Sequence, residues 1–141
     1  MKILREGDLP ASPAAVLEVL ADLPRWEEWF AMHKGWSSPP PARAETGARF
    51  KHRVRVLGAP GEVSWKILAF DAPGSCVLEG KGPSRTSLGL EIRVVPADAG
   101  SHITFDATIG GLLVKPIESQ LRNWLDTGID RTLTNLTVVL A

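Results

Sequence analysis

The sequence predicts an α+β fold in which a curved antiparallel sheet wraps around one long C-terminal helix. Between residues 49 and 109, apolar residues recur at every second position in successive segments separated by short turns. That pattern is typical of half-buried antiparallel strands. Residues 116–141 instead carry apolar residues three and four positions apart, which predicts an amphipathic helix. The apolar face of such a sheet needs a cover, and we expect this helix to supply it.

The chain begins with a predicted edge strand over residues 2–9, where apolar and polar residues alternate weakly. Ser12 then precedes Pro13, which is the pattern of an N-cap followed by a first-turn proline. A short helix is therefore expected to start at this point and to end near Asp22.

A second short helix is predicted over residues 25–32. Trp26, Trp29 and Phe30 have the spacing that places aromatic rings on one side of a helix. We expect the two tryptophans to anchor the short helices against the sheet. The proline- and glycine-rich residues 35–47 predict a loop with at most a short extended piece.

The strands of the meander follow the loop. They are predicted over residues 49–56, 62–69, 76–79, 86–94 and 102–109. Glycine and proline mark turns at residues 58–61, 71–74, 80–83 and 96–100, and Gly110 and Gly111 end the sheet.

The final helix is well signalled at its start, because Pro116 suits the first helical position. Its apolar face contains two unusual residues, Gly128 and Thr132. Glycine costs about 1 kcal/mol relative to alanine inside a helix, and threonine brings a hydroxyl group. Both residues suggest a place where this face does not pack tightly, such as the wall of a cavity that needs room and one polar contact.

Length and composition favour a single domain over residues 1–141, since a chain of this size buries a sufficient core without disulfides or a bound metal. Sixteen basic and sixteen acidic residues balance, so no overall field attracts nucleic acid or an anionic membrane, and partners must be argued from local features. Cys76 is the only cysteine, which excludes an internal disulfide and fits a reducing compartment. No apolar run approaches the length of a membrane span. A cytoplasmic protein without a transmembrane segment is expected.

Four groups of residues in a fixed order also carry a family resemblance, together with the long C-terminal helix. They are Ala11, Ser12, Pro13, Val16, Leu20, Asp22, Leu23, Pro24, Arg25, Trp26 and Trp29; Gly47, Arg49 and Phe50; Phe70, Asp71, Ala72 and Pro73; and residues 96–105. In this order and spacing the chain resembles the START-like superfamily (polyketide cyclase/dehydrase and lipid transport superfamily, SRPBCC).

This resemblance covers nearly the whole chain and implies the helix-grip fold, with a cavity between the sheet and the C-terminal helix. Proteins similar to this chain include lipid-binding and transfer domains, plant carriers of hydrophobic ligands, bacterial aromatase/cyclases, a ribosome-associated family and a class of co-chaperones. The resemblance therefore predicts the fold and leaves the function open.

The candidate ligand-binding residues are those predicted to face this cavity: Phe50, His52, Trp65, Leu90, Phe105, Trp124, Gly128 and Thr132. His52 could donate a hydrogen bond to a ligand carbonyl or exchange a proton with it; alternatively, it is a hydrogen-bonded core histidine. Trp65 and Trp124 could stack on a flat ligand or simply fill the core. Residues 110–114 are either a mobile lip at the cavity opening or part of the core.

Other chemistry finds little support in the sequence. Neither His33 nor His102 has metal-ligand neighbours at a suitable spacing, so no metal site and no cofactor is predicted. No nucleophile elbow, phosphate-binding loop or inward pair of carboxylates is recognisable. The basic stripe of Arg49, Lys51, Arg53 and Arg55 is expected to be a solvated strand face with cross-strand ion pairs.

Three functions remain after this survey. The first is binding of a small hydrophobic molecule or lipid in the cavity, and the absence of a catalytic constellation favours it over an enzyme. The second is a polyketide aromatase/cyclase that uses the same cavity, with His52 or a neighbouring polar group assisting proton transfer. The third is a protein- or ribosome-interaction module without a ligand, which predicts a filled interior.

Overall fold

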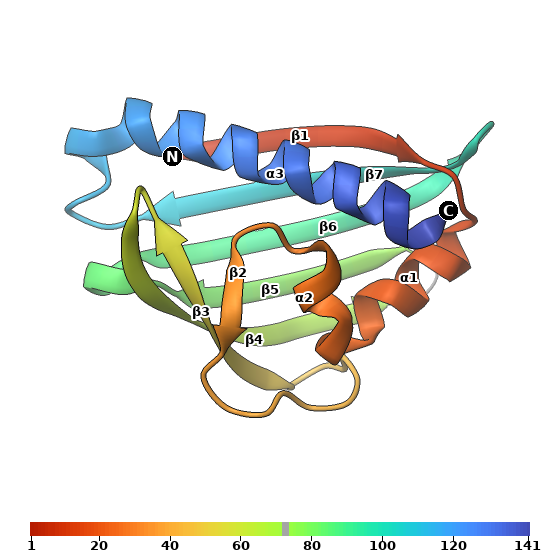
Figure 1. The fold of residues 1–141 in the computed structure, drawn as a ribbon, viewed down its shortest axis with the longest axis horizontal. Coiled ribbons are helices and arrows are strands. Elements are labelled where there is room, and N and C mark those ends of the chain that lie inside the picture. Colours follow the sequence, from red (N-terminus) through yellow and green to blue (C-terminus); the bar gives the residue numbers. More distant parts are fainter. Residues whose placement is uncertain (72–73) are drawn as a thin grey trace.

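The structure is a computed structural model that describes residues 1–71 and 74–141. Seven strands form one antiparallel sheet in the order β1-β7-β6-β5-β4-β3-β2. Figure 1 shows this sheet curving beneath the long helix α3, with α1 and α2 beside the C-terminal end of α3. The predicted helix-grip fold is confirmed.

The strands agree with the predicted meander, and most are longer than predicted. They are β1 (Lys2–Leu9), β2 (His33–Trp36), β3 (Arg49–Val56), β4 (Ala59–Asp71), β5 (Ser75–Lys81), β6 (Ser87–Ala97) and β7 (Gly100–Gly110). β1 is an edge strand, as its weak alternation predicts. Pro60, Gly61, Gly80 and Pro96 lie inside strands, although their residue types indicated turns. Part of the turn predicted at 71–74, Ala72 and Pro73, lies outside the described residues.

β2 is the short extended piece that the prediction for residues 35–47 allowed, but it starts earlier, at His33. The segment His33–Trp36 has no alternation to mark it as a strand. It is a strand because the free edge of β3 offers backbone partners: His33 pairs with Val54, and Trp36 pairs with His52. This added edge strand brings His33 alongside His52.

The helices follow the predicted order with shifted ends. They are α1 (Pro13–Ala21), α2 (Trp26–Trp29) and α3 (Glu118–Leu140), with 3₁₀ turns η1 (Leu23–Arg25), η2 (Pro83–Arg85) and η3 (Lys115–Ile117). The Ser12 hydroxyl accepts a hydrogen bond from the Ala15 amide at 3.3 Å, which confirms the predicted N-cap. Pro116 lies in η3, so α3 itself starts two residues later than predicted.

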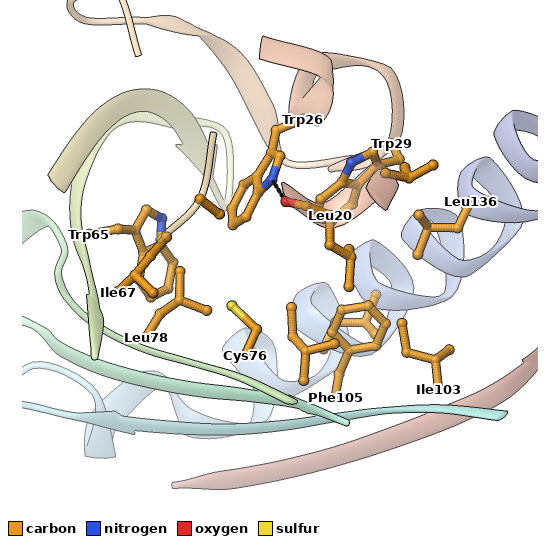
Figure 2. Packing of buried hydrophobic residues seen from close by; sticks show 14 of the residues in the cluster. Leu20, Trp26, Trp29, Trp65, Ile67, Cys76, Leu78, Ile103, Phe105 and Leu136 are labelled. Atoms are coloured by element: carbon orange, nitrogen blue, oxygen red, sulfur yellow. Dashed lines mark hydrogen bonds between the residues drawn. The ribbon is translucent and has the colours of Figure 1, made fainter. Parts of the chain in front are cut away.

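The core lies between the concave face of the sheet and the helices (Figure 2). Trp26 is almost fully buried and donates its indole N–H to the Leu20 carbonyl at 2.9 Å. This bond ties η1 and α2 to α1, which is the anchoring role predicted for Trp26. None of the described helices is long and apolar enough to cross a membrane.

Candidate functional site: an apolar cavity between the sheet and α3

A cavity of about 450 Å³ lies between the concave face of the sheet and α3. Inward side chains of β3, β4, β6 and β7 form its floor, and α3 covers it together with Phe30 and Met32. This volume falls within the range of small-molecule sites, roughly 300–1,000 Å³. The filled interior predicted for a pure interaction module is therefore not observed.

Six of the eight predicted ligand-binding residues line this cavity. They are His52, Trp65, Leu90, Phe105, Trp124 and Thr132. Sequence analysis missed other lining residues, for example Val54, Val63, Ile109 and Ile129. The period-two pattern could have found Val54 and Val63, since each lies two positions from a predicted lining residue on the same strand.

Phe50 lies outside the lining, contrary to its predicted place at the cavity. Its ring packs edge-on against Trp26, with ring centroids 5.1 Å apart. The Trp26 indole from α2 thus fills the space above Phe50 on β3. The cavity begins beyond this contact, where Trp29, Phe30 and Met32 line it.

Gly128 also lies outside the lining, and the reason for its small size is different from the one predicted. A Cβ atom at this position would lie 2.9 Å from the Met32 sulfur. The missing side chain lets α3 approach the segment that follows α2. Gly128 is a close-packing site between α3 and Met32 and does not widen the cavity.

The Thr132 hydroxyl already has partners within the protein. It accepts a hydrogen bond from the Ala31 amide at 3.2 Å and donates one to the Gly128 carbonyl at 2.9 Å. This side chain therefore fastens α3 to the segment after α2. Since the hydroxyl is engaged, the methyl group is the part of Thr132 that suits an apolar cavity wall.

His52 is completely buried and forms the centre of a chain of three rings. The Trp65 indole donates its N–H to His52 Nε2 at 3.0 Å, and His52 Nδ1 lies 2.9 Å from His33 Nδ1. An indole N–H can only donate, so Nε2 accepts and the proton of neutral His52 lies on Nδ1. His52 Nδ1 therefore donates to His33, and both ring nitrogens of His52 are occupied.

The protonated form of His52 is strongly disfavoured. Burial and, to a smaller extent, the neighbouring His33 together lower its pKa to about 3. Burial also lowers the pKa of His33, with Glu27 opposing and Arg53 adding to this effect. A neutral histidine without a free nitrogen cannot act as a proton donor or acceptor toward a ligand. Of the two interpretations of His52 offered by the sequence, the hydrogen-bonded core histidine is therefore the one that fits the structure.

Trp29 holds the one buried side-chain nitrogen without a hydrogen-bond partner among the described residues, its Nε1. Trp29 is almost fully buried and lines the cavity, so it does more than anchor α2. An unpaired buried donor costs about 1–3 kcal/mol. The unpaired indole nitrogen is thus a polar group that the protein leaves unsatisfied in a residue of the cavity wall.

Three connections surround the open end of the cavity: the β3–β4 turn, the segment around η2 and the β7–α3 connection. Leu112 is 96% exposed and Leu113 is 59% exposed, whereas Val114 is buried. Residues 110–114 therefore divide between the two predicted alternatives. Leu112 and Leu113 form an exposed lip, and Val114 belongs to the core.

Cys76, a metal site and the basic stripe were the other features considered for function, and none of them contributes to this cavity. Burial raises the pKa of the Cys76 thiol to about 12, so it is an inert core residue. No cluster of three metal-ligating side chains occurs within residues 1–71 and 74–141. The basic stripe is exposed, but its predicted cross-strand ion pairs are absent among the described residues. Arg53 lies opposite Glu62 in register without pairing to it.

An antiparallel sheet that encloses an apolar cavity beneath a long C-terminal helix defines a helix-grip protein. The chain belongs to the family described as polyketide cyclase / dehydrase and lipid transport, whose model matches residues 2–141. The family thus agrees with the superfamily that the sequence motifs resemble.

Curated relatives and solved structures extend the comparison. Toxin Rv0910 from Mycobacterium tuberculosis is 32% identical over 135 residues, which cover 95% of this chain and 94% of that protein. Among solved structures, Ms6760 from Mycobacterium smegmatis superposes with a TM-score of 0.77 at 12% identity, covering 99% and 90% of the two chains. CV1439 from Chromobacterium violaceum has a TM-score of 0.75 at 15% identity, covering 99% and 96%. These structures share the fold.

Proposed function

We propose that this protein binds a small, predominantly apolar molecule or lipid in the cavity between the sheet and α3. The observation that carries the proposal is a mostly apolar space of about 450 Å³ in which His52, Trp65 and Thr132 make their hydrogen bonds within the protein. Such a lining favours a hydrocarbon or ring surface over a charged or sugar-like ligand.

The energetics support an occupant. An unfilled core cavity costs on the order of 24 cal/mol per Å³, which for this volume gives an upper bound of about 11 kcal/mol. That is comparable to the whole stability of a typical domain, about 5–15 kcal/mol. A ligand that fills the space recovers part of this free energy as contacts, so affinity does not need many polar interactions.

One acceptor on the ligand fits the site as well. Trp29 Nε1 is a buried donor in a lining residue and has no partner among the described residues. We therefore expect a mostly apolar ligand that carries a single carbonyl, ether or hydroxyl oxygen. A charged group would stay at the open end, where solvent is available.

Native mass spectrometry of protein purified from its own host tests this proposal. The expected result is a retained ligand released on denaturation, with a mostly hydrocarbon composition and at least one oxygen. Protein that arrives empty and gains no stability from any member of a panel of apolar compounds would rule the proposal out. A retained pure hydrocarbon would contradict only the expectation that a ligand oxygen accepts a hydrogen bond from Trp29 Nε1.

The aromatase/cyclase alternative receives no support from the side chains that line the cavity. His52 was its proton-transfer group, and both nitrogens of this ring are engaged in the chain from Trp65 to His33. Its lowered pKa also keeps it neutral. Within residues 1–71 and 74–141, no other titratable side chain lines the cavity.

A second candidate function follows from the similarity to Toxin Rv0910 along almost the full length of both chains. Under this hypothesis, excess protein inhibits growth of its host. Induced expression with growth measurement tests it, and unimpaired growth at high protein levels would exclude it. A variant with a filled cavity then shows whether growth inhibition depends on ligand binding.

A further inference from the structure

The open end of the cavity is surrounded by a rim built from three connections. They are the β3–β4 turn with its flanks (residues 55–60), the segment around η2 (residues 81–87) and the β7–α3 connection (residues 110–117). Figure 1 shows all three at the end of the molecule away from the C-terminus. Residues of the last two connections lie close together, since the position of a Cβ on Gly111 is 3.4 Å from the Arg85 carbonyl oxygen.

This rim exposes apolar side chains to an unusual degree. Four of the eight large exposed hydrophobic residues of the described chain lie on it: Leu57 at 43%, Leu112 at 96%, Leu113 at 59% and Ile117 at 38%. Single exposed leucines are common on proteins, but several on adjoining loops mark an interaction surface. Three of the four also line the cavity, so the exposed apolar surface is continuous with the interior.

Leu57 occupies a position that a leucine does not favour. Leu57 and Gly58 form a two-residue turn with φ values of 50° and 85°. Such hairpin turns prefer Asn-Gly, because asparagine adopts the left-handed conformation more readily than leucine. The protein thus carries an apolar side chain at the tip of this hairpin although another residue would suit the turn better.

The charges of the rim are all of one sign. Arg55, Lys81, Arg85 and Lys115 are exposed, and residues 55–60, 81–87 and 110–117 contain no carboxylate. None of these four cations forms an ion pair with another described residue. The first acidic residue after the β7–α3 connection, Glu118 at the start of α3, pairs with Arg122. The chain as a whole is neutral, so the positive charge of the rim is a local excess and does not reflect the overall composition.

We propose that the rim docks on the surface of an anionic phospholipid bilayer. Leu57, Leu112 and Leu113 would enter the boundary between head groups and acyl chains, and the four cations would lie among the anionic head groups. Such a surface offers an apolar layer to the exposed leucines. It also offers negative charge to the unpaired cations, and the rim has no carboxylate that would be repelled. Docking in this orientation places the cavity opening against the acyl chains, which gives an apolar ligand a route that avoids water.

Vesicle co-sedimentation tests the docking directly. Vesicles of phosphatidylcholine alone are compared with vesicles that also contain phosphatidylglycerol. We expect binding to the anionic vesicles, weakening with salt, and little binding to the neutral ones. Leu57→Asn should reduce binding several-fold and raise Tm, because it creates the favoured Asn-Gly turn. Its control is Leu4→Asn, since Leu4 is 60% exposed on β1 outside the rim.

The charge part of the proposal has its own pair of variants. Arg85→Gln and Lys115→Gln should each weaken binding to anionic vesicles by about fivefold, the effect of one cation near such a surface. Arg49→Gln is the matched control, because Arg49 is an exposed cation at the far end of β3. Equal losses from Arg49→Gln would show a general charge effect and overturn the docking site.

Other outcomes also overturn the proposal. Absence of binding to anionic vesicles rejects it outright. If Leu57→Asn converts a dimer to a monomer in solution without changing vesicle binding, the rim is an interface between two copies of this chain. The cavity proposal is judged separately, since a variant with a filled cavity should still dock while binding no ligand.

Discussion

Replacing Ala107 with phenylalanine is expected to abolish ligand binding while leaving the protein folded. Ala107 lies on β7, lines the cavity and is paired with Ile3 and Leu90 in the sheet. A benzyl group at this position occupies space that a ligand needs, and it also fills part of an otherwise costly void. We expect affinity to fall by more than about a hundredfold, with an equal or higher free energy of unfolding.

Isothermal titration with the ligand identified from the host measures this loss, and urea unfolding measures stability. Thr108→Phe is the matched control, because Thr108 is the next residue on β7 and is exposed on the opposite face of the sheet. Retained binding in Ala107→Phe, with an unchanged fold, would show that the ligand does not occupy this cavity.

The second large effect concerns His52 and acid. The pKa of His52 in the folded protein, about 3, lies below the usual value near 6.5 because the ring is buried. Between these two values the unfolded chain binds the proton and the folded chain does not. The contribution of neutral His52 to the free energy of unfolding is therefore fully present above pH 6.5. It falls by about 1.4 kcal/mol per pH unit as the pH is lowered below this value. His52 alone is expected to contribute a loss of about 2 kcal/mol between pH 7 and pH 5; His33, whose pKa is also lowered, adds to this loss.

Urea unfolding at pH 7 and pH 5 measures this dependence in the wild type and in His52→Gln. The glutamine removes the titration, and its side-chain oxygen can still accept from the Trp65 indole. His102 supplies the opposite control, because hydrogen bonding to Asp8 raises its pKa and makes it stabilise the fold at low pH. His102→Gln should steepen the loss toward pH 5. An unchanged slope in His52→Gln would show that His52 is not the group that titrates.

Much of the fold was predictable because its signals are local. Alternation along β3 and β7 and the helical spacing of α3 depend only on which side chains must leave water. The Ser12 cap is equally local. Turn residues were less reliable: Pro60 and Gly61 lie in β4, because the actual turn is at Leu57 and Gly58. Backbone pairing between long strands outweighed their intrinsic preference for turns.

The candidate site was predictable in part for the same reason. Inward positions on a strand follow from its period, so His52, Trp65 and Phe105 were placed on the cavity side. Whether an inward residue meets a cavity or a neighbour depends on what stands opposite it. Phe50 faces Trp26, and Gly128 faces Met32. Both contacts join parts of the chain that are far apart in sequence.

The sequence therefore determined the architecture of this protein, a curled antiparallel sheet under an amphipathic helix, because periodicity records burial residue by residue. Only the tertiary structure decided the chemistry of the interior. The edge strand β2 placed His33 beside His52, which occupied the second nitrogen of a ring that the sequence left free for a ligand. The exposed, carboxylate-free rim likewise emerged from three connections that only folding brings together.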